Sequence, residues 1–191
     1  MQLYTESKPN AAQNMAFDRD LFAQTRADHQ LRFRLYTWES TSVTYPERIT
    51  LPADYAQLDA ASRPSGGGIV FHHPGELGFT CAATLKDPHF PPQFRDKLCW
   101  FQDWIAQSLT RYPTSAPATP SKSATRTSSN HAPVLCTDYP SPYELHLGDK
   151  KILGLAIRRY KDVFLVQGVV HLSLPPQAFI DSFLRGSSCY V

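Results

Sequence analysis

The sequence predicts an α+β fold of mostly antiparallel sheets flanked by helices, and three observations lead to this prediction. Strand-like segments are grouped along the chain instead of alternating one by one with helices, which indicates an α+β architecture. Other segments repeat apolar residues every three or four positions, as amphipathic helices do. Hydrophobic residues make up 42% of the chain and charged residues 19%, which is sufficient for a buried core. We therefore expect one domain over residues 1–191.

Three helices are expected. The first covers residues 10–25, where Asn10 can cap the start. The clearest covers residues 93–110, in which apolar side chains recur at spacings of three and four. A shorter helix is expected within residues 175–185. The apolar face of the first helix consists of Ala11, Met15, Leu21 and Phe22.

The expected strands follow from alternating or continuous apolar patterns. Residues 31–38 alternate Leu and Phe with Arg and Tyr, which is typical of a half-buried strand. The Pro-Gly and Lys-Asp pairs at 74–75 and 161–162 indicate turns between neighbouring strands. The remaining strands are expected over residues 42–45, 68–73, 77–85, 143–147, 151–160 and 163–174.

Residues 113–133 differ in composition from the rest of the chain. They are rich in Ser, Thr, Ala and Pro and have no apolar face. A loop of this length inside one domain is unusual unless it is functional or disordered. We expect a mobile, low-complexity loop at about residues 113–133.

Composition argues against several classes of function. The net charge is only +2 and basic residues form no long run, so we expect no nucleic-acid partner. No apolar run reaches the roughly 18 residues of a membrane span, and no signal peptide is recognisable, so we expect no membrane partner and a cytoplasmic protein. The four cysteines include no C-x-x-C pair, and we expect no metal site.

Gly66–Gly68 directly precede an apolar strand-like run and follow Arg63. The stretch is not a Walker-type phosphate loop, because no Gly-Lys-Ser/Thr opens a helix there. It is either a bulge or turn, or a bare backbone surface on which a ligand lies. In the second interpretation Arg63 would supply charge and a forked hydrogen-bond donor.

Four further residues are candidates with two interpretations each. Lys151 is either a solvated residue of a hairpin or a pocket residue beside the glycines. Cys136 is a bystander or a nucleophile, and a nucleophile needs partial exposure and a nearby positive group. His72 and His73 are neighbours on a strand and therefore point to opposite faces. We expect one of them to be buried and the other exposed, without a metal.

Taken together, these segments resemble the lipoate–protein ligase and octanoyltransferase family, relatives of the biotin–protein ligases. Residues 14–22 and 31–45 are similar to that family's opening helix and next strand pair. Its Gly-rich and lysine-bearing elements are similar to RPSGGGIVFHHPGELGFT and LGDKKILGLAIRRYKDVFLVQG, in the same order. The match covers most of the chain apart from the low-complexity segment. It implies the catalytic-domain fold of that family.

The resemblance also implies roles for individual residues. Lys151 falls on the essential lysine, which holds the acyl carbonyl and, in ligases, the phosphate. A fixed cation beside a carbonyl stabilises the negative charge that develops in acyl transfer. The implied substrate-binding residues are Arg63, Ser65, Gly66, Gly67, Gly68, His72, Gly154 and Ala156.

Two mechanisms remain open within this family. One octanoyltransferase branch carries a nucleophilic cysteine upstream of the lysine, a layout to which CTDYPSPYELHLGDKK is similar. Cys136 would then carry the acyl group from a carrier-protein thioester to the acceptor lysine, without ATP. A ligase would instead activate free lipoate with ATP and Mg. The implied partners are lipoyl-carrier domains of 2-oxoacid dehydrogenase complexes or the glycine cleavage H protein, with acyl carrier protein as donor in the thioester route.

The sequence also departs from the family's pattern around the expected pocket. The departures are at Pro46, Ile49, Pro64, His73, Leu155 and Gln167. Two alternatives are therefore kept. One is a biotin–protein ligase-like enzyme, against which the Gly-rich element argues. The other is a catalytically degenerate paralogue that binds a ligand without turnover.

Overall fold

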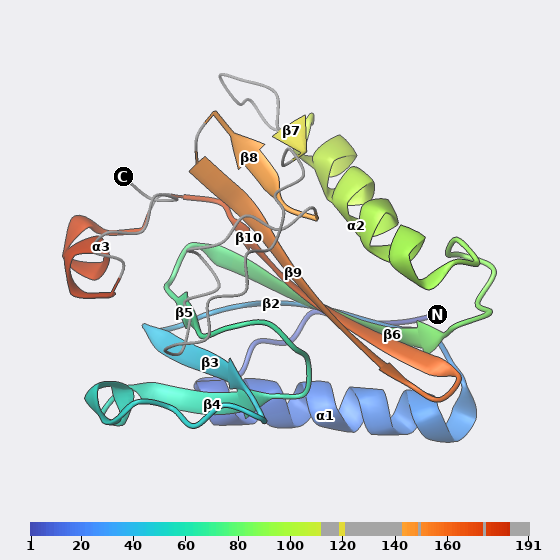
Figure 1. Cartoon of the computed structure of the whole chain (residues 1–191), viewed down its shortest axis with the longest axis horizontal. Helices are drawn as coiled ribbons and strands as arrows, with labels where there is room; N and C mark the ends of the chain where they lie inside the picture. The colour runs from blue at the N-terminus through green and yellow to red at the C-terminus, as the bar shows by residue number, and fades with distance from the viewer. Residues whose placement is uncertain (112–118, 121–142, 149, 174, 184–191) are drawn as a thin grey trace.

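The computed structural model describes residues 1–111, 119–120, 143–148, 150–173 and 175–183. Within these ranges the chain folds into a seven-stranded sheet, a three-stranded sheet and flanking helices (Figure 1). The elements are β1 Gln2–Tyr4, α1 Ala11–Asp28, β2 Arg32–Thr37, β3 Ser42–Pro46, the 3₁₀ turn Ala53–Tyr55, β4 Asp59–Arg63, β5 Val70–His72, β6 Glu76–Thr84, α2 Phe94–Leu109, β7 Thr119–Pro120, β8 Leu145–Leu147, β9 Lys150–Tyr160, β10 Val163–His171 and α3 Gln177–Phe183.

The large sheet has the strand order β1-β2-β6-β10-β9-β8-β7, and only its β1–β2 pair is parallel. Figure 1 shows this sheet between α1 and α2. Alternate residues of β6 face the two helices, as the period of a strand requires. Phe79 and Cys81 pack in the cluster that contains Phe101 of α2, whereas Ala82 packs with Leu21 of α1. Both faces of the central strands are therefore buried.

The small sheet has the order β4-β3-β5 and lies beside one end of α1 (Figure 1). Its β3–β4 pair is parallel and its β3–β5 pair is antiparallel. Val43, Ile69 and Phe71 form its apolar core together with Phe179 of α3. This second sheet places β4 and β5 opposite strands β9 and β10 of the large sheet.

Helix α1 begins as predicted, because the Asn10 side chain accepts a hydrogen bond from the Gln13 backbone N–H. It ends three residues later than predicted, with His29 in the left-handed conformation at φ 60°. The four residues of the predicted apolar face are all buried. This helix is an example of a segment whose local pattern and tertiary packing agree.

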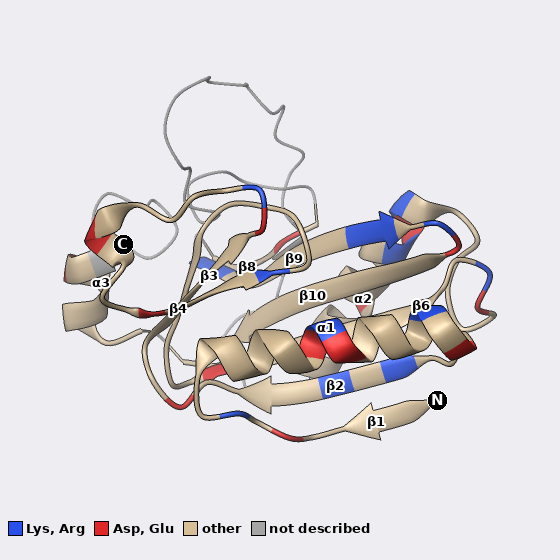
Figure 2. Ribbon diagram, turned by 90° about the horizontal axis from the view of Figure 1, so that it is seen from below, with Lys and Arg blue, Asp and Glu red and all other residues tan. Residues whose placement is uncertain are grey.

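Strand β2 alternates as predicted, but the face that carries its arginine side chains is buried instead of exposed. Arg34 is fully buried and donates to Asp18 of α1 at 2.8 Å. In Figure 2 the acidic part of α1 lies over the basic positions of β2. Thr80 and Gln167 also donate to Asp18, each at 2.7 Å. Burial raises the pKa of Asp18, while Arg34 and these donors lower it. The arginine face is thus covered by a helix that supplies its counter-charge.

The predicted α+β class with mostly antiparallel sheets and flanking helices is confirmed. Strands β1, β4 and β7 were not predicted, and β7 (Thr119–Pro120) lies inside the segment predicted as a loop. Strand β5 is shorter than the predicted 68–73 because the glycines before it bend. Most of the segment 113–133 lies outside the described residues, so its mobility stays a prediction. None of the helices in the described ranges has the length and apolar character that crossing a membrane requires.

Candidate functional site

A narrow cavity of about 60 Å³ lies where the small sheet faces β9 and β10 of the large sheet. Its wall is mainly apolar, with Met15, Trp38 and Val70 among the lining residues. Five of the predicted site residues line it: Arg63, His72, Lys151, Gly154 and Ala156. The cavity therefore brings together five predicted residues that lie up to 93 positions apart in the sequence.

The predicted residues Ser65 and Gly66–Gly68 do not line this cavity. Gly67 has a φ of 97°, a conformation that favours glycine, and the stretch forms a bend rather than the start of a strand. The glycines connect to the cavity through Arg63. Their contact with a ligand stays a prediction.

Arg63 holds the glycine bend in place. Its guanidinium donates to the carbonyl oxygens of Gly66 at 2.7 Å and Gly68 at 2.6 Å. It also donates to the Thr44 carbonyl at 2.9 Å. The forked, planar donor set of arginine suits this arrangement, which a lysine could not reproduce. The sequence predicted that Arg63 would donate to a ligand. Its guanidinium also donates to the backbone carbonyls beside the cavity.

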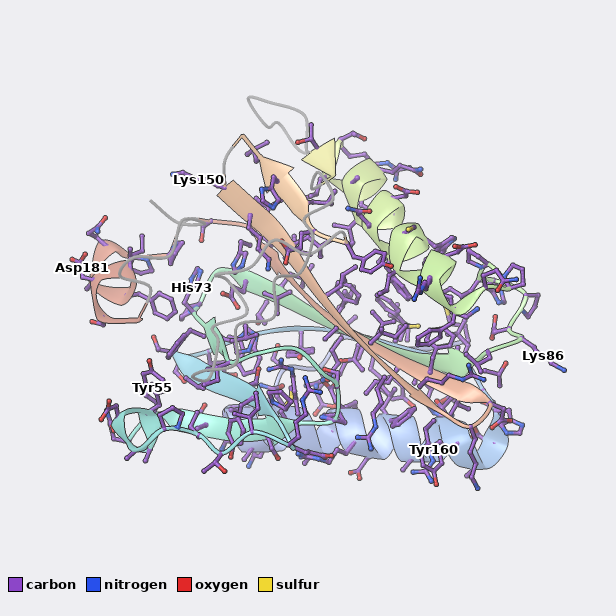
Figure 3. The ribbon with its side chains drawn as sticks, viewed as in Figure 1. Tyr55, His73, Lys86, Lys150, Tyr160 and Asp181 are labelled. Atoms are coloured by element: carbon purple, nitrogen blue, oxygen red, sulfur yellow. The ribbon has the colours of Figure 1, made fainter. Side chains whose placement is uncertain are left out.

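Lys151 reaches the cavity because β9 contains a bulge. Leu145 pairs with Leu153, but the next residue, His146, pairs with Lys151, so Ile152 is left out of the register. A bulge re-aims the side chains on one side of it. Lys151 consequently shares a face with Gly154, where an added Cβ would lie 3.5 Å from the lysine Cε. Figure 3 labels the neighbouring Lys150, which begins the strand.

Glu144 provides the counter-charge for Lys151. Both side chains are buried, and the lysine Nζ donates to Glu144 Oε1 at 2.5 Å. Gln102 of α2 donates to the Glu144 carbonyl at 2.7 Å, which ties this segment to the helix. Sequence patterns did not indicate Glu144. The available signal was an acidic residue at the start of an apolar strand, seven positions before a lysine.

His72 is held by hydrogen bonds at both ring nitrogens. Its Nδ1 lies 2.9 Å from Glu76 Oε2, and its Nε2 lies 2.8 Å from the Thr44 hydroxyl. An ionised carboxylate only accepts, so Nδ1–H donates to Glu76 and Nε2 accepts from Thr44. The His72 ring also stacks on Trp38, with ring centroids 3.9 Å apart. His72 therefore shapes the cavity wall with its polar atoms already engaged.

Burial and hydrogen bonds together set the pKa values of His72 and Glu76. Burial lowers the pKa of His72, although the neighbouring Glu76 opposes the shift. Burial alone would raise the pKa of Glu76, but hydrogen bonds from His171 and His72 outweigh it and lower the pKa to about 2. At neutral pH these two shifts leave the His72 imidazole neutral and the Glu76 carboxylate ionised.

The prediction of one buried and one exposed histidine is wrong, because His72 and His73 are both buried. Strand β5 ends at His72, and both rings reach the Glu76 carboxylate, His72 Nδ1 at 2.9 Å from Oε2 and His73 Nε2 at 3.5 Å from Oε1. Trp38 covers His72, and Phe179 of α3 packs against His73 with ring centroids 5.4 Å apart. The candidate nucleophile Cys136 lies outside the described residues.

Residues 10–188 match the family model of the lipoyl protein ligase A/B catalytic domain. The chain belongs to this family. The resemblance drawn from the sequence motifs is thereby confirmed. The matched residues include the small sheet, all of the large sheet except β1, and every residue that lines the cavity.

Curated relatives within this family carry the name octanoyltransferase LipM. The protein from Kyrpidia tusciae is 27% identical over 186 residues, which cover 93% of this chain and 68% of that protein. The protein from Lysinibacillus sphaericus is 32% identical over 161 residues, which cover 78% of this chain and 57% of that protein. The chain thus spans between 57% and 68% of the length of these two relatives.

Solved structures of the family share the fold. A lipoate-protein ligase A with bound ATP superposes with a TM-score of 0.71 at 20% identity, covering 95% of this chain and 70% of that one. A bipartite lipoate protein ligase from Thermoplasma acidophilum, studied with its E2 lipoyl domain, gives a TM-score of 0.59 at 18% identity. That match covers 100% of this chain and 72% of the ligase chain.

Proposed function

We propose that the chain attaches an octanoyl or lipoyl group to the acceptor lysine of a lipoyl-carrier domain. The observation that carries this proposal is the buried Lys151 at the wall of a narrow, mainly apolar cavity. A linear acyl chain matches the apolar lining, and the lysine matches the polar end of such a chain. Membership of the lipoyl protein ligase A/B family supports the same chemistry.

The reaction we propose is an acyl transfer to an amine. The amine of the acceptor lysine attacks the acyl carbonyl carbon, and the carbonyl electron pair moves to oxygen. The positive charge of Lys151 stabilises this oxyanion. The carbonyl re-forms as the leaving group departs with its bonding electrons, and the amine proton is released. The small residues Gly154 and Ala156 keep the acyl chain's path open beside Lys151.

We further propose that the donor is an octanoyl thioester on acyl carrier protein. Relatives at 27% and 32% identity carry the octanoyltransferase name, which favours this donor over free lipoate with ATP and Mg. The Cys136 thiolate would attack the thioester, releasing the carrier thiol, and then pass the acyl group to the acceptor lysine. The acceptors we propose are lipoyl domains of 2-oxoacid dehydrogenase complexes or the glycine cleavage H protein.

The deciding experiment measures the mass of a purified lipoyl domain after incubation with this chain. One arm supplies octanoyl-acyl carrier protein without ATP, and the other supplies octanoate or lipoate with ATP and Mg. We expect an octanoyl adduct in the first arm. Modification only in the ATP arm would instead establish a ligase.

Variants separate the roles of individual residues in the same assay. Lys151→Ala should abolish transfer from either donor, whereas Cys136→Ala should abolish it only from the thioester. Lys150→Ala is the matched control, since this neighbouring lysine starts the same strand and does not line the cavity. No adduct from the unmodified chain in either arm would exclude both enzymatic proposals. Calorimetric binding of octanoate without turnover would then indicate a ligand-binding paralogue.

A further inference from the structure

A second cluster of functional groups lies next to the cavity between the two sheets, which we call the acyl cavity because of its proposed ligand. The cluster is located where the β5–β6 turn meets the end of β10. It consists of His73, Glu76 and His171. One donor atom from each residue lies within 4.8 Å of the other two. His73 Nε2 lies 3.5 Å from Glu76 Oε1, and His171 Nδ1 lies 3.1 Å from the same oxygen. These separations approach the spacing between neighbouring ligands of one tetrahedral ion.

We propose that His73, Glu76 and His171 bind a divalent transition-metal ion, with zinc as the best match. Two imidazole nitrogens and one carboxylate oxygen form a donor set that suits zinc, and three protein ligands leave a fourth position for water. The proposal stands apart from the acyl-transfer function, because none of its steps uses Lys151 or Cys136.

The first support is the orientation of His73. Its Nδ1 lies 2.9 Å from the Pro74 carbonyl oxygen, which can only accept, so the ring proton is held at Nδ1. The lone pair is consequently at Nε2, which is buried and makes no hydrogen bond to any residue in the described ranges. Metal-binding histidines characteristically donate their other ring N–H to a backbone carbonyl in this way.

The second support is the fixed position of Glu76. Its side chain is buried, and its second oxygen, Oε2, is taken by the His72 ring. This hydrogen bond leaves Oε1 directed at His73 and His171. A buried carboxylate is costly unless a cation or hydrogen bonds compensate it. His72 and His171 supply that compensation here, and a divalent ion at Oε1 would take the place of the contribution from His171.

The third support is the rigidity of the backbone that carries the three residues. Glu76 and His171 are directly paired across β6 and β10. Gly75 has a φ of 114°, and its carbonyl accepts from the Leu172 N–H at 3.1 Å. Figure 3 shows His73 on the side of the molecule that carries Asp181 of α3. The turn and the strand end are thus joined before any ion binds.

The sequence predicted no metal site because it contains no C-x-x-C pair and because His72 and His73, as neighbours on a strand, were expected to point to opposite faces. The proposed site uses only His73, and its third ligand comes from a residue 98 positions later. His171 also lines the cavity between the two sheets, so the proposed site adjoins that cavity. We infer that the ion fastens the β5–β6 turn to β10 and supports the cavity wall.

The test uses the full chain, stripped of metal with a chelator and titrated with Co(II) and then Zn(II). We expect one Co(II) per chain, visible d–d absorption without a thiolate charge-transfer band, and displacement by Zn(II). His73→Gln and His171→Gln should each weaken binding by at least about tenfold. His89→Gln, at an exposed histidine outside the cluster, should bind as the unmodified chain does. Failure of the unmodified chain to bind either ion would overturn the proposal.

A second measurement covers the case in which the variants do not fold. In the unmodified chain with ¹⁵N-labelled histidine, Zn(II) should shift one Nε2 and one Nδ1 resonance of two different buried rings. Resonances that do not move, or equal binding by both folded variants, would exclude this site. A thiolate charge-transfer band would place the metal on cysteine instead. The Glu76–His171 ion pair would then be sufficient to explain the cluster.

Discussion

Glu144 Oε1 lies 2.5 Å from Lys151 Nζ, both side chains are buried, and Lys151 lines the cavity between the two sheets. A buried ammonium group needs a compensating charge, and removing one partner of such a pair is strongly destabilising. The carboxylate therefore fixes the position of the Lys151 Nζ. Glu144 is therefore a positioning residue for Lys151, the proposed catalytic lysine.

Glu144→Gln should lower both stability and acyl transfer. The amide keeps the shape but removes the counter-charge, so we expect the free energy of unfolding to fall by about 3 kcal/mol. Urea denaturation measures this change, and the lipoyl-domain assay should show a lower kcat. Glu39→Gln, at an exposed glutamate, is the control and should leave both quantities unchanged. Normal stability of Glu144→Gln would show that the ion pair does not hold Lys151.

Gly154→Ala should narrow the cavity without unfolding the protein. The added Cβ would lie 3.5 Å from Lys151 Cε and 3.8 Å from its Nζ, which is ordinary van der Waals contact. Since one methylene in an apolar pocket changes binding by about 1–3 kcal/mol, we expect roughly tenfold slower octanoyl transfer and a shift toward shorter acyl donors. Equal rates for all chain lengths would argue that the acyl chain lies elsewhere.

Gly66→Ala is the companion experiment for the glycine bend. No atom of the residues that the structure describes lies within 4 Å of a Cβ added at Gly66, so this variant should fold normally. If the bend contacts the acyl donor, as the sequence resemblance implies, transfer should slow while the urea midpoint stays unchanged. An unchanged rate would assign the bend a purely structural role.

Local sequence patterns predicted the helices and the long hairpin well, because their periodicity reports burial directly. Lys151 was also a candidate, but only its resemblance to a family element favoured the pocket over the solvent. The side chain reaches the cavity through the bulge at Ile152, and a residue left out of strand register produces no periodic signal. The orientation of Lys151 therefore required the structure.

Buried charge is the other feature that sequence patterns did not report. Arg34 alternates with apolar residues, as a solvent-facing residue would, yet it is fully buried against Asp18. Glu144 is likewise buried, against Lys151. Burial of a charge depends on a partner supplied by the tertiary fold, so local periodicity cannot distinguish it from exposure.

Asp28→Asn should weaken the protein at neutral pH and have less effect in acid. Hydrogen bonds from Arg32 hold the pKa of Asp28 well below its usual range. The unfolded-state pKa is about 3.9, so this carboxylate stabilises the fold above about pH 4, and the contribution is lost as the pH falls. Urea midpoints of the two proteins should therefore converge between about pH 5 and pH 2. Asp20→Asn, exposed on the same helix, should show no such convergence.

Arg63→Lys should loosen the glycine bend and destabilise the protein. The guanidinium donates to the carbonyls of Gly66, Gly68 and Thr44 at once, and the compact ammonium of lysine cannot span the three. Buried carbonyls that lose a charged donor cost about 1–3 kcal/mol each, so we expect a loss of at least about 2 kcal/mol in urea denaturation. Arg159→Lys, at an exposed arginine of β9, should change stability by less than about 0.5 kcal/mol. Equal stability of Arg63→Lys and the unmodified chain would mean that the backbone of the bend holds its own conformation. If that variant also lost acyl transfer, Arg63 would be assigned to ligand contact instead.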